Sequence, residues 1–285
     1  MALIDCDLML LYCNGRHCYR RSPLSRLIQS PMSKLPPHYQ FVDLSDYGRK
    51  PARQIALALQ GTSVTPVQVT SWFILSGVLA IICMLMQYHI AAAVFLILKS
   101  VLDAADGELS RVKNQPSYVG RYYDSIADII LNFLFLITLW HITGDSLWHV
   151  ALAFIGIQLQ GTLYNYYSVI LRNSVEGDTT SRVFEDHAPV AMKGESQRSV
   201  NLFYRIYNIL YIVFDKTIYF LDKNAMHSKP FPRWFMALLS TFGLGFQLLL
   251  MAAFLAVGLD HYIIPFFIAY SGLIMVFVAI RRWML

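Results

Sequence analysis

Four aspartates lie close together in a stretch that is otherwise rich in apolar residues: Asp103, Asp106, Asp124 and Asp128. Carboxylates at membrane depth cost free energy, and they are kept there when they have a function. Residues three or four apart share one face of a helix, so the first two acids form one pair and the last two form another. Two such faces brought together would make an oxygen-rich site suited to hard divalent cations.

The residues between the acids complete one face of the first predicted helix. With the first two acids, they fall at i, i+3, i+4, i+7 and i+8: Asp103, Asp106, Gly107, Ser110 and Arg111. The next predicted helix carries Gly120 ahead of the second acid pair. Acids that only capped helices, or that lay in a solvated loop, would not need two matching faces. The pattern therefore favours one shared site.

This spacing resembles the signature of the CDP-alcohol phosphatidyltransferase family, D-x2-D-G-x2-A-R-x8-G-x3-D-x3-D. The match runs from residue 103 to residue 128, with Ser110 where the family has alanine. That exchange replaces one small side chain by another and is expected to preserve the nucleotide pocket. The hydropathy pattern extends the resemblance to residues 42–285. The resemblance implies a membrane enzyme that transfers a substituted phosphate group from a CDP-linked alcohol to an acceptor alcohol and releases CMP.

The resemblance also implies a role for each motif acid. Asp103, Asp106 and Asp124 look like metal ligands, while Asp128 looks like a further ligand and the general base. The implied cofactor is a pair of Mg²⁺ ions, with Mn²⁺ as an alternative. Two ions would neutralise charge during in-line displacement at the phosphoanhydride, and a carboxylate would take the proton of the attacking hydroxyl.

The other motif residues resemble a nucleotide site. Gly107 and Gly120 correspond to glycines that let the nucleotide lie against the two helices, since glycine permits close approach. Ser110 lies beside this nucleotide position. Arg111 corresponds to the residue that pairs with the diphosphate, for which a guanidinium is well shaped.

Three cations outside the main signature are candidates for contacts with the acceptor or its headgroup: Lys99, Arg121 and Arg172. Lys99 lies one helical turn before Asp103, so the alternative for Lys99 is an ion pair with that aspartate. Cations at the cytoplasmic ends of membrane spans commonly set topology instead.

The composition is that of an integral membrane protein. Of the 285 residues, 56% are apolar and only 14% are charged. A span needs about 20 apolar residues, and six runs approach or exceed this length, at 67–88, 89–105, 119–142, 146–171, 234–259 and 261–281. We therefore expect an all-α integral membrane fold with six transmembrane helices, the CDP-alcohol phosphotransferase fold that the resemblance implies.

The cations indicate how these helices are oriented. The short connections at 87–89, 143–146 and 259–262 contain no Lys or Arg, whereas the opposite helix ends hold nearly all of them. By the positive-inside rule, both termini and the aspartate motif face the cytoplasm. The formal net charge of +5 thus reflects topology and gives no reason to expect nucleic acid. A bacterial inner membrane and a eukaryotic endomembrane both fit this pattern.

The chain divides into a tail and a membrane domain. Residues 1–40 are expected to form a cytoplasmic or interfacial tail, and residues 41–285 the catalytic domain. Within that domain, an amphipathic helix at 51–60 is expected to lie in the inner interface before the first span. Residues 172–233 are predicted to be a cytoplasmic loop with an interfacial segment, for which a seventh span at 201–222 is the alternative.

Several functional readings remain open at the level of sequence. The favoured donor is CDP-diacylglycerol; the alternative is a CDP-choline or CDP-ethanolamine type of enzyme that uses diacylglycerol as acceptor. The resemblance further implies membrane lipids as partners and a homodimer. A divalent-cation transporter is a candidate from a different class, although Arg111 among the acids would hinder cation passage. Release of CMP would separate the enzyme from the transporter.

Overall fold

The computed structural model describes residues 13–14, 17–18, 35–175, 187–228 and 230–284. The chain forms two compact units, Met1–Lys34 and Leu35–Leu285. In the first unit, strands β1 (Cys13–Asn14) and β2 (His17–Cys18) pair antiparallel. Most of the predicted tail of residues 1–40 lies outside the described residues.

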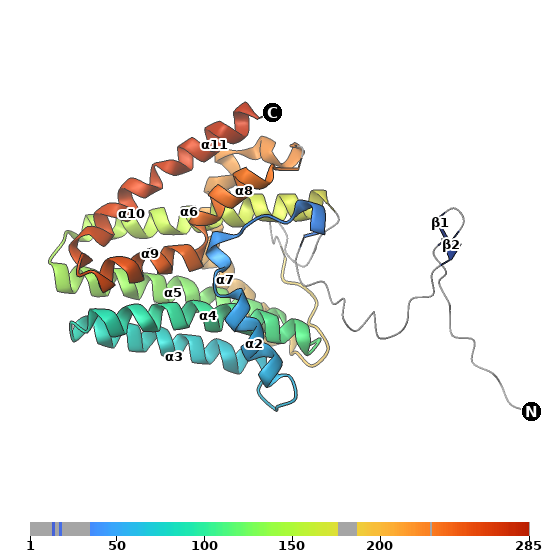
Figure 1. Ribbon diagram of the computed structural model, residues 1–285, viewed down its shortest axis with the longest axis horizontal. Coiled ribbons are helices and arrows are strands. Elements are labelled where there is room, and N and C mark those ends of the chain that lie inside the picture. Colours follow the sequence, from blue (N-terminus) through green and yellow to red (C-terminus); the bar gives the residue numbers. More distant parts are fainter. Residues whose placement is uncertain (1–12, 15–16, 19–34, 176–186, 229, 285) are drawn as a thin grey trace, which may run out of the picture. The chain divides into compact units, whose positions relative to one another are not determined.

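The second unit is helical, which confirms the all-α prediction. Its main helices are α2 (Arg49–Leu59), α3 (Pro66–Leu85), α4 (His89–Val112), α5 (Tyr118–Thr143), α6 (Leu147–Ser174), α7 (Gln197–Leu221), α8 (Arg233–Leu239), α9 (Leu244–Ala256), α10 (Ile263–Ser271) and α11 (Leu273–Trp283) (Figure 1). Short 3-10 helices are η1 (Pro37–Tyr39), η2 (Leu44–Asp46), η3 (Lys223–His227), η4 (Ser240–Phe242) and η5 (Asp260–Tyr262).

Local sequence signals explain where the helices of the site begin and end. Thr65 and Gln68 form a reciprocal capping box at the start of α3, with Pro66 in the first turn. The Ser117 hydroxyl caps α5 by accepting a hydrogen bond from the Gly120 amide at 2.8 Å. At its other end, α5 stops at Gly144, whose φ of 69° is the left-handed conformation that glycine adopts without strain.

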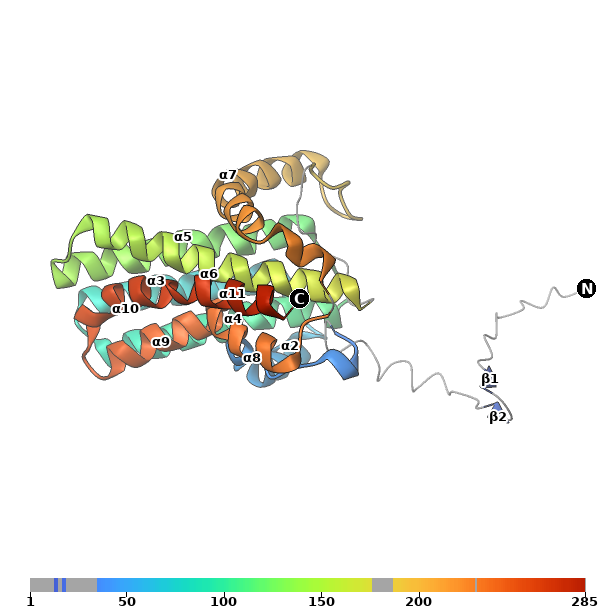
Figure 2. The same ribbon diagram turned by 90° about the horizontal axis from the view of Figure 1, so that it is seen from above.

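The long helices form a bundle around an apolar core. Figures 1 and 2 show α3, α4, α5, α6, α9 and α10 running alongside one another. Fully buried side chains of this core include Phe73, Leu96, Phe135, Leu139 and Phe267. Helix α3 packs against both α4 and α5, and α2 packs against α4 through Ala52 and Ala56. Helix α3 thus holds the two helices that carry the acids.

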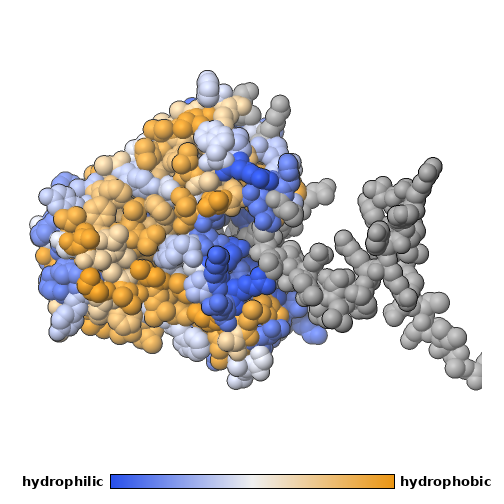
Figure 3. Space-filling model, viewed as in Figure 1, coloured by the Kyte–Doolittle hydropathy of each residue, from blue (hydrophilic) through white to orange (hydrophobic). Residues whose placement is uncertain are grey.

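The protein is a multi-pass membrane protein, although the count of six spans is not confirmed. Within the described residues, three helical segments are long and apolar enough to cross a membrane: Pro66–Leu85, Tyr118–Thr143 and Asp260–Trp283. The bent pair Arg233–Phe242 and Leu244–Ala256 makes a fourth if it is one span. Helices α4 and α6 are 24 and 28 residues long, yet both bury polar side chains. Figure 3 shows apolar residues over the middle of the bundle and hydrophilic residues at its ends.

The expected fifth span, 234–259, contains a bend. Its two parts, α8 with η4 and then α9, meet at an angle of 54°. Helix η2 from the N-terminal side fills the bend, and the Leu44 amide donates a hydrogen bond to the Ser240 hydroxyl at 2.8 Å. Two glycines allow this approach, because a Cβ on Gly243 or Gly245 would lie 2.4 or 2.0 Å from atoms of Ser45.

Helix α7 covers most of residues 201–222, which the sequence predicted as an interfacial segment or, alternatively, a seventh span. Among the described helices, α7 is not one of those apolar enough to cross a membrane. It lies along one side of the bundle, against α5 and α6 (Figure 2). The helix expected at 51–60 is present as α2, and its place in the membrane interface stays a prediction.

The close contact at the bend predicts different effects for two glycine substitutions. Gly245→Ala should lower the unfolding midpoint of the detergent-solubilised protein, because the new methyl group would meet the Ser45 carbonyl oxygen. Overpacking of this kind costs roughly 1–3 kcal/mol. Gly161→Ala is the matched control: it lies within α6 and has nothing within 4 Å of an added Cβ. Equal midpoints for the two variants would contradict the close contact at the bend.

Candidate active site

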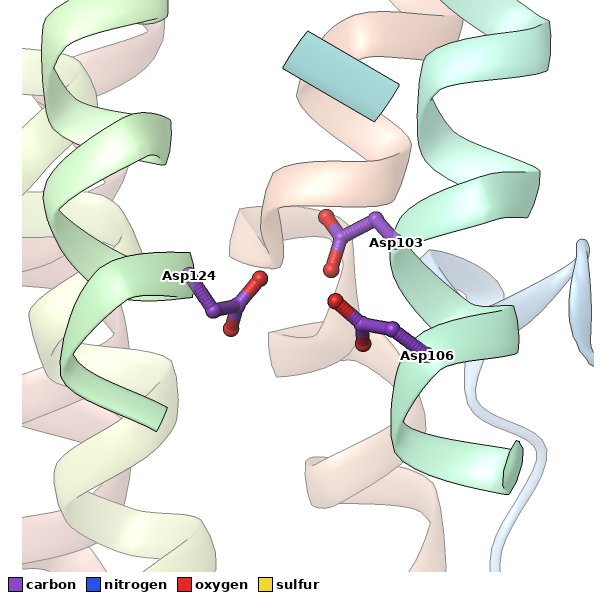
Figure 4. A group of neighbouring side chains, drawn as sticks. All are labelled: Asp103, Asp106 and Asp124. Atoms are coloured by element: carbon purple, nitrogen blue, oxygen red, sulfur yellow. The ribbon is translucent and has the colours of Figure 1, made fainter. Parts of the chain in front are cut away.

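Three of the predicted acids meet between α4 and α5. Asp103 and Asp106 project from α4 toward Asp124 on α5 (Figure 4). One carboxylate oxygen from each lies within 4.8 Å of the other two. This arrangement follows from the spacing in the sequence, because Asp103 and Asp106 share a helix face. We call these three residues the aspartate triad.

Helix α3 fixes the most buried member of the triad. The Thr70 hydroxyl donates a hydrogen bond to Asp106 Oδ2 at 2.6 Å, and both side chains are buried. Such a bond orients a carboxylate and satisfies one of its lone pairs. Sequence reasoning missed Thr70, since nothing in the spacing of the motif points to a residue 36 positions away.

The triad has the properties of a cation site. Asp124 Oδ1 is buried and has no hydrogen-bond partner among the described residues. A buried carboxylate oxygen without a partner is costly, whereas a bound cation would satisfy it. Three converging carboxylates are hard oxygen donors, which suit Mg²⁺ or Mn²⁺. These residues therefore fit the predicted divalent metal.

The fourth acid, Asp128, lies beside the triad and contacts a different cation. Lys99 Nζ donates a hydrogen bond to Asp103 Oδ2 at 2.8 Å and another to Asp128 Oδ1. The lysine side chain is almost completely buried, with 1% of its surface exposed. Lys99 thus forms the ion pair with Asp103 that the sequence left open, and it also reaches the second acid-bearing helix.

Arg111 lies over the glycine face of α4. Its guanidinium nitrogens are 3.7 and 3.8 Å from the point where a Cβ on Gly107 would be. Arg111 also forms an ion pair with Glu108 at 2.7 Å. Glu108 is buried and lies 4.0 Å from Arg49 as well. The sequence analysis did not single out Glu108, which holds Arg111 at the edge of the site.

The other two predicted nucleotide residues make local contacts. The Ser110 hydroxyl donates a hydrogen bond to the Gln115 carbonyl at 2.9 Å, so it helps to shape the turn after α4. A Cβ on Gly120 would lie 3.1 Å from Ser117 Oγ and 3.5 Å from Val67 of α3. The side of α5 that carries Gly120 therefore faces α3. The nucleotide contacts of both residues stay a prediction.

The structure gives Arg121 and Arg172 separate surroundings. The Arg121 guanidinium lies over the rings of Tyr118 and Tyr122, 5.4 and 4.9 Å from their centroids. Arg172 is buried near the end of α6 and donates a hydrogen bond to the Ser168 carbonyl at 3.1 Å. Acceptor contacts from either arginine stay a prediction.

Helix α7 supports the acid-bearing part of α5 from the side. The Tyr211 hydroxyl donates a hydrogen bond to the carbonyl of Ser125, between the two acids of α5, at 2.7 Å. Tyr211 stacks on Tyr207 at 4.8 Å between ring centroids, and Tyr207 contacts Tyr122 at 5.2 Å. The sequence predicted α7 only as an interfacial or spanning segment and gave no sign of this contact.

Glu195 fastens the segment before α7 to the start of α5. Its Oε1 accepts hydrogen bonds from the Ser117 hydroxyl at 2.7 Å and the Val119 amide at 2.8 Å. Its Oε2 accepts one from the Met192 amide at 3.2 Å. A carboxylate at a helix N-terminus is also favoured by the helix dipole. Glu195 therefore helps to set the position of the helix that carries Asp124.

Fold and site together define a multi-pass membrane protein with three converging aspartates between two helices. Residues 63–184 match the family model of the CDP-alcohol phosphatidyltransferases, and this part of the chain is a domain of that transferase family. A bifunctional IPC transferase and DIPP synthase from Thermococcus kodakarensis is 34% identical over 87 residues. That match covers 30% of this chain and spans one fifth of the relative's length.

Glu195 gives the protein a stability that depends on pH. Burial raises the pKa of Glu195, but the hydrogen bonds from Ser117, Val119 and Met192 outweigh burial and lower it below 4.5. A carboxyl group whose folded-state pKa is lowered stabilises the folded state above its unfolded-state pKa, and this stabilisation is lost as the pH falls through the folded-state value.

We therefore expect Glu195→Gln to lower the thermal unfolding midpoint at pH 7. The difference in midpoint from the wild type should become smaller as the pH falls below about 4.5. Thermal unfolding of both proteins in detergent from pH 3 to pH 7 measures this. Ser117→Ala, which removes one of the donors, should reduce the same pH-dependent difference. The same difference in unfolding midpoint between wild type and Glu195→Gln at every pH would contradict this prediction.

Proposed function

We propose that this protein transfers a substituted phosphate group from a CDP-linked alcohol to the hydroxyl of an acceptor alcohol, with release of CMP. The observation that carries the proposal is the aspartate triad, assembled from two helices inside the part of the chain that matches the transferase family. The glycine face of α4, with Arg111 beside it, supports a nucleotide diphosphate next to that triad.

In the proposed reaction, a new bond forms between the acceptor oxygen and the donor's β-phosphorus. The bond from that phosphorus to the bridging oxygen breaks, and CMP leaves with the electron pair. Divalent cations held by the triad would stabilise the negative charge on the phosphate oxygens. Arg111 would bind the diphosphate, and Asp128 would take the proton of the acceptor hydroxyl. Two cations is the number that the family resemblance implies.

The favoured donor is CDP-diacylglycerol, which would enter from the lipid phase. A small polar acceptor would then approach from the aqueous end of the bundle. The relative is named as a bifunctional IPC transferase and DIPP synthase, which supports a transfer reaction here and does not choose between the donors. The alternative remains an enzyme that transfers a CDP-linked headgroup to diacylglycerol.

Topology and assembly belong to the same proposal. The acids lie near the helix ends whose flanking segments carry most of the Lys and Arg residues, which supports a cytoplasmic active site. A homodimer is proposed from the family resemblance.

The first test is CMP release by the purified protein in lipid nanodiscs with magnesium and CDP-diacylglycerol. Asp106→Asn and Asp124→Asn should each lower the rate by roughly 10³-fold or more, because a catalytic metal supplies several kcal/mol and about 1.4 kcal/mol corresponds to tenfold. Asp145→Asn, beyond the other end of α5, is the matched control and should keep the wild-type rate. Near-normal turnover in both triad variants would contradict the proposed role of the aspartate triad in the transfer reaction.

A second test concerns Asp128. If Asp128 takes the acceptor proton, Asp128→Asn should lower turnover by about 10²–10⁴-fold, the usual scale of a general base. Saturating magnesium should leave the rate at this low plateau. Recovery to near the wild-type rate at high magnesium would show that Asp128 acts mainly as a metal ligand, and it would overturn the assignment as base.

A further inference from the structure

Helix α7 presents an apolar stripe to the outside of the bundle. The stripe consists of five side chains with between 37% and 75% of their surface exposed: Leu202, Ile206, Ile209, Val213 and Phe220. Their spacings of four, three, four and seven residues place them along one face of the helix. The other side of α7 packs against α5 and α6 (Figure 2). A contiguous exposed apolar face of this kind marks contact with a membrane or with another protein.

Three cations follow one edge of the apolar stripe. Arg198, Arg205 and Lys216 are exposed, and each lies four residues before a member of the stripe. Four residues turn an α-helix by a full turn and about 40° more, so the three cations are displaced to the same edge. Asp215, the single acid of α7, lies outside the stripe and outside this edge. The exposed side of α7 is therefore apolar and positively charged.

The opposite edge of α7 is apolar and faces the middle of the bundle. Leu210 and Phe214 lie on this edge. Phe214 contacts Phe154 of α6, which in turn contacts Phe133 of α5, with 6.4 and 5.4 Å between ring centroids. Phe133 lies near the middle of α5, whereas Asp124 lies near its start. A helix with one cationic and one apolar edge is typical of the membrane interface, where the cations stay at headgroup level.

We propose that α7 binds anionic phospholipid headgroups on the side of the membrane where the aspartate triad lies. In this arrangement the three cations lie at headgroup level and the apolar stripe lies in the acyl layer. Among the described helices, α7 is not one of those apolar enough to cross a membrane, which favours a position along its surface. Each Lys or Arg near an anionic surface strengthens binding roughly fivefold. The inference concerns the outer surface of α7, so it is independent of the proposed function.

The side of α7 opposite the stripe reaches the acid-bearing part of α5. The Tyr211 hydroxyl donates its hydrogen bond to the carbonyl of Ser125, which lies between Asp124 and Asp128. Contact with anionic lipid on the outer side would restrain α7, and through Tyr211 it would also restrain this part of α5. The lipid surface would therefore support the helix that carries two of the four acids.

Hydrogen–deuterium exchange of the whole protein in nanodiscs tests the inference without a measurement of activity. Nanodiscs of phosphatidylcholine alone are compared with nanodiscs of equal parts phosphatidylcholine and phosphatidylglycerol, which is anionic. We expect the backbone amides of α7 to exchange at least about tenfold more slowly in the anionic nanodiscs, since three cations contribute there. High salt should reduce this difference, because salt screens charges at the membrane surface.

A matched pair of variants separates the charges of α7 from the net charge of the protein. Arg198→Gln, Arg205→Gln and Lys216→Gln combined should remove the difference in exchange between the two lipids. The control variant should keep this difference; it combines substitution by Gln at three exposed lysines outside α7, namely Lys50, Lys193 and Lys223. If the α7 variant does not fold, the wild-type protein at low and high salt carries the test.

Equal exchange of α7 in the two kinds of nanodisc would overturn the inference, as would an equal loss of the lipid effect in the control variant. If a second copy of the chain covered the stripe instead, exchange would depend on whether a nanodisc holds one or two copies and not on the lipid charge. That result would overturn the inference as well. CMP release is measured separately, so failure of this inference leaves the proposed transferase intact, and a protein that releases no CMP could still show the lipid effect.

Discussion

The cost of gathering four carboxylates in an apolar helical bundle is the constraint on which the rest of the structure depends. Carboxylates that lose water must gain other partners, or they destabilise the fold. Asp106 gains the Thr70 hydroxyl, and Asp103 and Asp128 share the Lys99 ammonium. Asp124 keeps a buried oxygen with no partner among the described residues. The charge of the site is thus only partly compensated by the protein, which leaves room for a cation.

The compensation comes from elements around the two acid-bearing helices. Helix α3 lies against both and supplies Thr70 and the Phe73 ring. Helix α7 contacts α5 through Tyr211. The segment before α7 is hydrogen-bonded to the start of α5 through Glu195. The motif supplies the aspartate triad, while residues far from the motif contact α4 and α5 and support the way in which the two helices face each other.

The sequence predicted the features that depend on local spacing. Helices α3 and α5 begin and end within three residues of the expected 67–88 and 119–142, because capping residues and short polar connections mark them. Helix α4 begins at the expected residue 89 but runs to Val112, past the expected 105. The triad was predictable because helical periodicity places Asp103 and Asp106 on one face. Thr70, Glu195 and Tyr211 were not predictable, since their contacts join residues 36, 78 and 86 positions apart. The break between α8 and α9 is in contact with η2, which is farther still in sequence: the hydrogen bond between Leu44 and Ser240 joins residues 196 positions apart.

The contact of η2 with this break has a consequence for how the chain is made. Leu44 bonds to Ser240, which lies 196 residues later in the sequence. During synthesis, the segment around Leu44 leaves the ribosome long before its partner exists, so it cannot dock until most of the helices have been inserted. The loop that this contact closes is long, and its entropy must be lost in a late step. Docking of η2 would therefore report that the helices up to α8 are in place.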